Sequence, residues 1–160
     1  MTKDKRSELA ARYASGVADV QDALAGATQQ DLDRRSPDYG AWSAREVVHH
    51  LADSETNSYL RLRRLIGDDG TPAILGFDEA GWATRLRYSS RPIDASLAVF
   101  VAVREASSEL LRSLADEIDW TRAGVHSDSG PYTAEDWLRI YANHAHEHAD
   151  QIRRAREGRA

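Results

Sequence analysis

The sequence contains no cysteine, only two lysines and no long apolar run. Without cysteine the chain can form no disulfide, no thiolate nucleophile and no cysteine-ligated zinc or iron–sulfur site. No stretch approaches the roughly 18 apolar residues of a membrane-spanning helix, and the first ten residues are too polar for a signal peptide. We therefore expect a cytoplasmic protein whose chemistry depends on His, Asp, Glu, Ser, Thr, Tyr or Arg.

The charge balance is acidic, with 26 Asp and Glu against 21 Lys and Arg, a formal charge of −5. An acidic surface does not attract nucleic acid or an anionic membrane, so neither is expected as a partner. The 160 residues suit a single domain spanning residues 1–160. A domain of this size can bury a hydrophobic core without covalent cross-links.

Four stretches show the apolar period of an amphipathic helix, and none shows the sustained alternation of a half-buried strand. The predicted helices cover residues 7–25, 43–66, 94–114 and 133–156. Ser43-Ala-Arg-Glu46 has the form of a capping box, and a weaker cap begins at Thr133. Four helices in a chain of this length predict an all-α four-helix bundle without a substantial sheet.

The connection over residues 67–91 is long for a helix bundle. Long loops in compact domains usually carry function or a short element of their own. Phe77, Trp82 and Leu86 are the apolar residues that we expect to hold this connection against the bundle.

Five of the six histidines fall into two groups, one in the second predicted helix and one in the fourth. At about 100° per residue, His144 and His148 lie within the apolar stripe of their helix, and His146 lies on the opposite face. By the same geometry His50 lies at the border of its stripe, whereas His49 points further toward solvent.

Two inward imidazoles at positions i and i+4 can bind one divalent cation, with a third imidazole from a facing helix. Three nitrogen ligands leave a position open for water or substrate, as in catalytic metal sites. The alternative is a set of hydrogen-bonded core histidines, which is the usual role of a single histidine on an apolar face.

Asp53, Glu147 and Gln151 are the candidates for orienting an imidazole or contacting a substrate. His144-Ala-His-Glu147-His148 also matches the H-x-x-E-H pattern of inverzincin metallopeptidases. Glu147, however, falls about 60° from His144 on the side away from the apolar centre. Solvent-exposed carboxylates are the alternative for Asp53 and Glu147, and Tyr141 is expected in the core.

Three segments of the chain resemble motifs of the DinB/YfiT-like superfamily. They are residues 42–59, residues 138–152 and residues 77–82, whose Phe-Asp-Glu-x-x-Trp is similar to the Tyr-Asp-Glu-x-x-Trp of the YfiT branch. The resemblance implies a four-helix bundle with up-down-down-up topology and a three-histidine site for a divalent metal, zinc or nickel. By position, it implies His50, His144 and His148 as the metal ligands.

The resemblance also implies an activity. Members are named provisionally as metal-dependent hydrolases, and the YfiT branch includes thiol S-transferases that join bacillithiol to electrophiles; related bundle enzymes use mycothiol, and members often form homodimers. We therefore expect a homodimeric, metal-dependent thiol S-transferase acting on a small-molecule thiol and an electrophile. The alternatives are a hydrolase using a metal-bound hydroxide, a non-catalytic metal- or ligand-binding stress protein, and a purely structural bundle. Family sequences are commonly richer in histidine after the last ligand, where this chain has Asp150 and Gln151.

Overall fold

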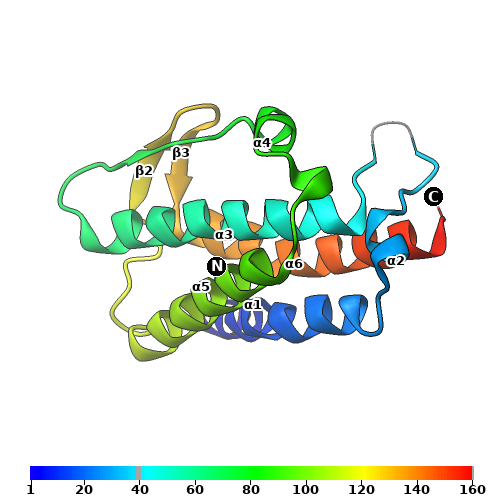
Figure 1. Cartoon of the computed structure of the whole chain (residues 1–160). Coiled ribbons are helices and arrows are strands. Elements are labelled where there is room, and N and C mark those ends of the chain that lie inside the picture. The colour runs from blue at the N-terminus through cyan, green and yellow to red at the C-terminus, as the bar shows by residue number, and fades with distance from the viewer. Residues whose placement is uncertain (39–40, 160) are drawn as a thin grey trace.

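Four long helices dominate the computed structural model, which describes residues 1–38 and 41–159 (Figure 1). They are α1 (Lys3–Leu24), α3 (Ala44–Gly67), α5 (Asp94–Ser113) and α6 (Ala134–Glu157). Each corresponds to one predicted helix, with bounds that differ by a few residues. The prediction of an all-α four-helix bundle is confirmed.

The directions of the helices give the bundle its topology. In Figure 1, α1 and α6 run one way and α3 and α5 run the other, which is up-down-down-up in chain order. Around the bundle, α1 and α3 each pack against both α5 and α6. Because the long helices α3 and α5 follow one another in the chain and run parallel, the chain must return along the bundle between them. A 24-residue helix is about 36 Å long, so this return alone needs about ten extended residues.

Shorter elements fill the connections between the long helices. They are α2 (Gln29–Asp33), β1 (Ala73–Ile74), α4 (Glu79–Arg85), the 3₁₀ helix η1 (Tyr88–Ser90), β2 (Ala123–His126) and β3 (Gly130–Thr133). β2 pairs in parallel with β1 and antiparallel with β3, which makes a small sheet. The sequence pattern does not predict this sheet, since strands of two to four residues containing Gly124, Gly130 and Pro131 show no alternation and have low strand propensity.

Complete capping boxes begin both helices that carry the histidine groups. The Ser43 hydroxyl accepts from the Glu46 amide at 3.3 Å, and the Glu46 carboxylate accepts from the Ser43 amide at 2.8 Å. Thr133 and Asp136 make the same reciprocal pair at the start of α6, at 3.1 and 3.0 Å. These caps satisfy amides that would otherwise lack partners, and so they fix where each helix begins.

Aromatic residues hold the long connection against the bundle. The rings of Phe77 and Trp82 lie 4.9 Å apart between centroids, and Phe77 also stacks at 6.4 Å on His50 of α3. Leu86 is 43% exposed, so the expectation that it pins the connection is wrong. The fully buried Tyr88 anchors this end of the connection instead, because the chain turns inward at η1 rather than at the end of α4.

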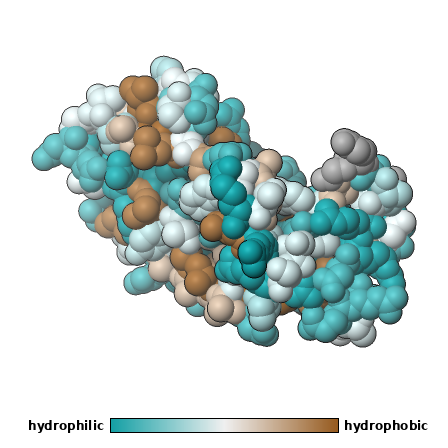
Figure 2. Space-filling view, turned by 45° about the horizontal axis from the view of Figure 1, so that its top comes forward, coloured by the Kyte–Doolittle hydropathy of each residue, from teal (hydrophilic) through white to brown (hydrophobic). Residues whose placement is uncertain are grey.

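The surface of the bundle is mostly hydrophilic in the view of Figure 2, with hydrophobic side chains gathered toward the end that carries the small sheet. Leu75 and Val125, beside and within that sheet, are 63% and 54% exposed. Within residues 1–38 and 41–159, no helix is both long enough and apolar enough to cross a membrane.

A close approach between α1 and α6 generates a stability prediction at Gly16. A Cβ atom at this position would lie 2.7 Å from the Ala145 Cβ and 2.9 Å from Arg104 Nη2. We expect G16A to lower the free energy of unfolding by about 1–3 kcal/mol through overpacking.

G67A is the matched control, because nothing lies within 4 Å of the added carbon at the end of α3. It is expected to be neutral or to stabilise by a few tenths of a kcal/mol. Urea unfolding of both variants makes the comparison, and equal stabilities would contradict the close approach of α1 and α6.

Candidate metal centre

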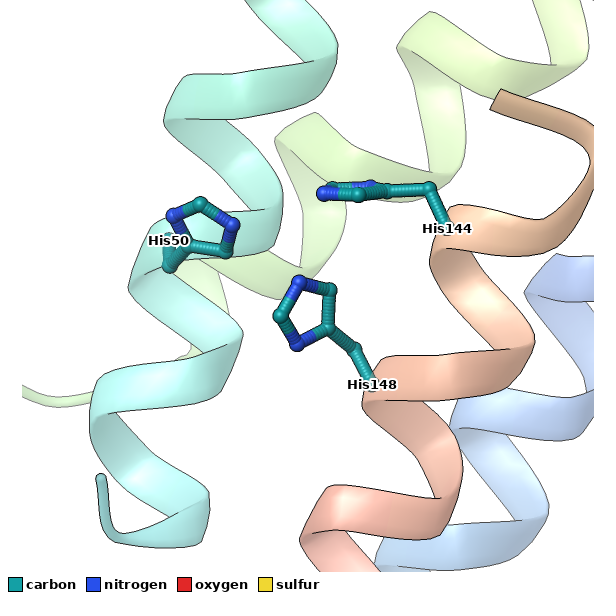
Figure 3. Close-up of side chains that lie close together, drawn as sticks. All are labelled: His50, His144 and His148. Atoms are coloured by element: carbon teal, nitrogen blue, oxygen red, sulfur yellow. The ribbon is translucent and has the colours of Figure 1, made fainter. Parts of the chain in front are cut away.

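Three histidines from two facing helices converge inside the bundle (Figure 3). His50 projects from α3 toward His144 and His148 of α6, and the ring centroids lie 5.5, 4.7 and 4.5 Å apart. Each residue offers one ring nitrogen, and these three atoms lie within 4.8 Å of one another. The structure thus brings together the three residues that the sequence indicates as ligands, in an arrangement that suits one ion with bonds of about 2 Å.

Burial keeps the imidazoles of His50 and His148 neutral. Burial, followed by the nearby rings of His148 and His144, lowers the pKa of His50 to about 2. Burial and then His144 likewise lower the pKa of His148 to about 4. Since a metal binds the deprotonated imidazole nitrogen, these two residues are in the required protonation state at neutral pH.

The chemistry of the donor set tests whether a metal fits. Three imidazole nitrogens that lie within 4.8 Å of one another are a donor set that zinc, nickel and similar divalent metals accept. The residues present therefore fit a divalent cation.

Gln151 is the one of the three accessory candidates that contacts the cluster. Its amide oxygen lies 2.7 Å from His148 Nδ1, where it accepts the ring N–H and leaves Nε2 free for a ligand bond. The neighbouring Asp150 is exposed and pairs with Arg153 at 2.9 Å. Gln151 therefore contacts the cluster, whereas Asp150 faces solvent.

Asp53 and Glu147 lie outside the cluster. Asp53 accepts a hydrogen bond from the Tyr88 hydroxyl, and Glu147 is exposed. The H-x-x-E-H match therefore brings no carboxylate to the histidines. Tyr141 is 3% exposed and packs edge-on against His144 at 5.5 Å between centroids, as expected of a core residue.

The two remaining histidines of these helices make structural contacts. His49, expected to point toward solvent, is 1% exposed, because α5 and η1 cover that side of α3. Its Nε2–H donates to the Arg91 carbonyl at 3.2 Å, and Nδ1 accepts from the Ser96 hydroxyl at 2.7 Å. His146 faces α1, where its ring lies 2.7 Å from Asp19.

An aromatic wall, formed by Trp42, Phe77 and Trp82, lies beside His50. The Trp42 ring is 4.9 Å from that of His50 between centroids, and Phe77 bridges His50 and Trp82. Two of its members come from the long connection, so the chain segment that reverses direction also shapes the surroundings of the site.

Glu55 lies next to His144 but is not among the residues that the sequence pattern indicates. It is fully buried, and its Oε1 atom is 3.7 Å from His144 Nδ1. The sequence does contain a sign of its burial, because Glu55 falls about 140° from His50 around the helix, beside the apolar stripe. A carboxylate at such a position is uncommon unless it is paired.

The fold and the cluster define the class of protein, which is a four-helix bundle with a three-histidine site suited to a divalent metal. The model of the DinB superfamily matches residues 12–152, and the chain belongs to that superfamily. A relative from Oceanobacillus iheyensis is 37% identical over 124 residues, 78% of this chain and 69% of the relative. YfiT of Bacillus subtilis is 35% identical over 136 residues, which cover 84% of this chain and 75% of YfiT. Both are named, provisionally, as metal-dependent hydrolases.

The solved structure of Bacillus subtilis YfiT confirms the likeness in three dimensions. It superposes with a TM-score of 0.87 at 30% identity and covers 100% of this chain and 91% of that one. That protein is described as a probable metal-dependent hydrolase with an unusual four-helix bundle topology. The predicted resemblance to the DinB/YfiT-like superfamily is confirmed.

The cluster predicts the metal content of the purified protein. We expect about one divalent metal ion per chain in the wild type and in H146A, whose imidazole faces α1 instead. H50A, H144A and H148A should each lose most of the metal, because two imidazoles remain. Elemental analysis of the five proteins measures this, and retention by H148A with loss by H146A would show the ligand assignment to be wrong.

The lowered pKa values predict how acid affects the metal-free protein. Histidine in an unfolded chain has a pKa near 6.5, so below that pH the unfolded chain binds protons at these two positions. In the folded protein His50 and His148 stay unprotonated over this range, because their pKa values are lower. The free energy of unfolding should therefore fall by roughly 1 kcal/mol per pH unit for each group between about pH 6.5 and 4.

Urea unfolding of chelator-treated protein at pH 7, 6 and 5 tests this dependence. H148Q removes one of the two groups and should show a shallower loss of stability toward acid. Identical pH profiles for the wild type and H148Q would contradict the burial of a neutral imidazole at this position.

Proposed function

We propose that this protein is a metal-dependent enzyme that joins a low-molecular-weight thiol to a small electrophile. The observation that carries the proposal is the cluster of His50, His144 and His148, which contains three nitrogen donors and no carboxylate among the described residues. A divalent cation held there would lower the pKa of a thiol that reaches it and so supply the nucleophile.

The surroundings of the cluster favour transfer over hydrolysis. Metal-dependent hydrolysis commonly uses a nearby carboxylate as general base, as the glutamate of H-E-x-x-H does. In the described residues Glu147 is exposed and Asp53 is engaged by Tyr88. Glu55 lies 3.7 Å from His144, but it is fully buried and paired with Arg104. Attack by a thiolate needs no such base once the thiol has lost its proton.

The chain's own side chains have distinct parts in this reaction. The three histidines would hold the cation, and Gln151 keeps a proton on His148 Nδ1, so that Nε2 stays available as a donor. The aromatic wall keeps water from one side of His50 and offers flat apolar faces to an electrophile. No residue of the chain needs to form a covalent intermediate.

A metal-dependent hydrolase is the second candidate. The provisional names of the relatives from Oceanobacillus iheyensis and Bacillus subtilis favour it. The same three imidazoles would serve that chemistry, because a cation lowers the pKa of water as it does that of a thiol.

Thiol dependence separates the two candidates. Protein loaded with zinc or nickel is incubated with bacillithiol, mycothiol or glutathione together with monochlorobimane, and adduct fluorescence is followed. We expect at least one thiol to react about tenfold or more faster than without protein, and a fall to background in H148A, which loses one of the ligands.

H146A is the matched control and should keep the acceleration, because its imidazole faces α1. An absence of acceleration with every thiol, together with turnover of ester or amide substrates by the same sample, would replace the transferase with the hydrolase.

A further inference from the structure

Glu55 and Arg104 form an ion pair in the interior of the bundle. Both side chains are fully buried, and Arg104 donates to Glu55 Oε1. The second carboxylate oxygen, Oε2, accepts from the Tyr13 hydroxyl at 3.1 Å. Because a guanidinium keeps its charge in proteins, the buried arginine requires an anionic partner, and Glu55 is that partner.

The charge of Glu55 determines what it can do for its neighbours. Burial raises the pKa of Glu55, but the buried guanidinium of Arg104 opposes this, and the net pKa lies below the ordinary value. An ionised carboxylate accepts hydrogen bonds and donates none. A neutral imidazole beside it is therefore stabilised when the nearer ring nitrogen carries the proton.

His144 is that imidazole. Its Nδ1 atom is buried, has no hydrogen-bond partner among the described residues, and lies 3.7 Å from Glu55 Oε1. This separation is longer than a hydrogen bond, yet small enough for a modest side-chain adjustment to close. The rings of His50, His148 and Tyr141 pack against the His144 ring.

From this arrangement we infer that Glu55 is a positioning residue, whose carboxylate holds the proton of His144 on Nδ1 and so presents Nε2 to the metal site. The inference rests on the proposed metal site. It gives His144 a supporting residue, as Gln151 is for His148. Carboxylate–histidine–metal triads raise the basicity of the ligand nitrogen and fix the orientation of the ring.

Removing Glu55 alone would leave Arg104 buried and unpaired, which endangers folding. The test therefore replaces the pair together by apolar residues of similar volume, E55M/R104M, and compares it with E55Q/R104M, which retains an acceptor oxygen. Y13F is the matched control, because it removes the other contact to Glu55 and leaves the carboxylate in place.

The first measurement is the tautomer of His144 in the metal-free protein, read from long-range ¹H–¹⁵N correlation spectra. We expect the Nδ1–H form in the wild type and Y13F, its loss in E55M/R104M, and its substantial retention in E55Q/R104M. A purely structural Glu55 would leave the tautomer unchanged in every variant, and that result would overturn the inference.

The second measurement is zinc affinity at pH 7 by competition with a chelating dye. E55M/R104M should bind about 10–100-fold more weakly than the wild type, and Y13F within about threefold. Wild-type affinity in E55M/R104M would overturn the inference. If the wild type binds no metal, the proposed function fails, while the tautomer measurement still decides the role of Glu55.

Discussion

A buried arginine, Arg104 of α5, contacts each of the other three long helices. Its guanidinium donates to Glu55 of α3, to the Tyr13 carbonyl of α1 and to the Tyr141 carbonyl of α6. Gly16 leaves room for it where α1 approaches α6. Breaking a buried ion pair costs about 3–5 kcal/mol, so the helices cannot shift apart at this level without a large penalty. The spacing of α3 and α6, on which the histidine cluster depends, is thus held by a charge at the centre of the bundle.

The same ion pair affects the protonation of the histidines. A lone carboxylate beside an imidazole favours the charged ring, which cannot bind a metal. Here Arg104 balances the charge of Glu55, and burial remains the leading influence on the pKa of His50 and of His148. Glu55 therefore lies close to a ring of the cluster while His50 and His148 stay neutral at neutral pH.

The sequence predicts correctly the features that depend on a single helix. The prediction fails where burial or pairing depends on a neighbouring element. The inward directions of His144 and His148 follow from 100° per residue, which any regular helix obeys. His49 is misjudged because exposure depends on α5 and η1, which one helix cannot reveal. The small sheet is missed because its strands are too short for periodicity to register. Glu55 is missed because its significance lies in Arg104, which is 49 residues away in the chain.

Charge also determines which further ligand a cation held by the cluster would favour. Three imidazole ligands, with an ion pair of zero net charge beside them, would leave both positive charges of a divalent cation uncompensated. An uncompensated charge in a buried setting costs several kcal/mol, so such a cation would favour an anionic ligand over a neutral one. The aromatic wall makes part of that surrounding apolar, which penalises a small, strongly hydrated oxygen anion. A thiolate carries its charge on a large, polarisable sulfur and tolerates such surroundings better. The charge count and the aromatic wall, which arise from different parts of the chain, therefore both support the proposal of a thiol substrate.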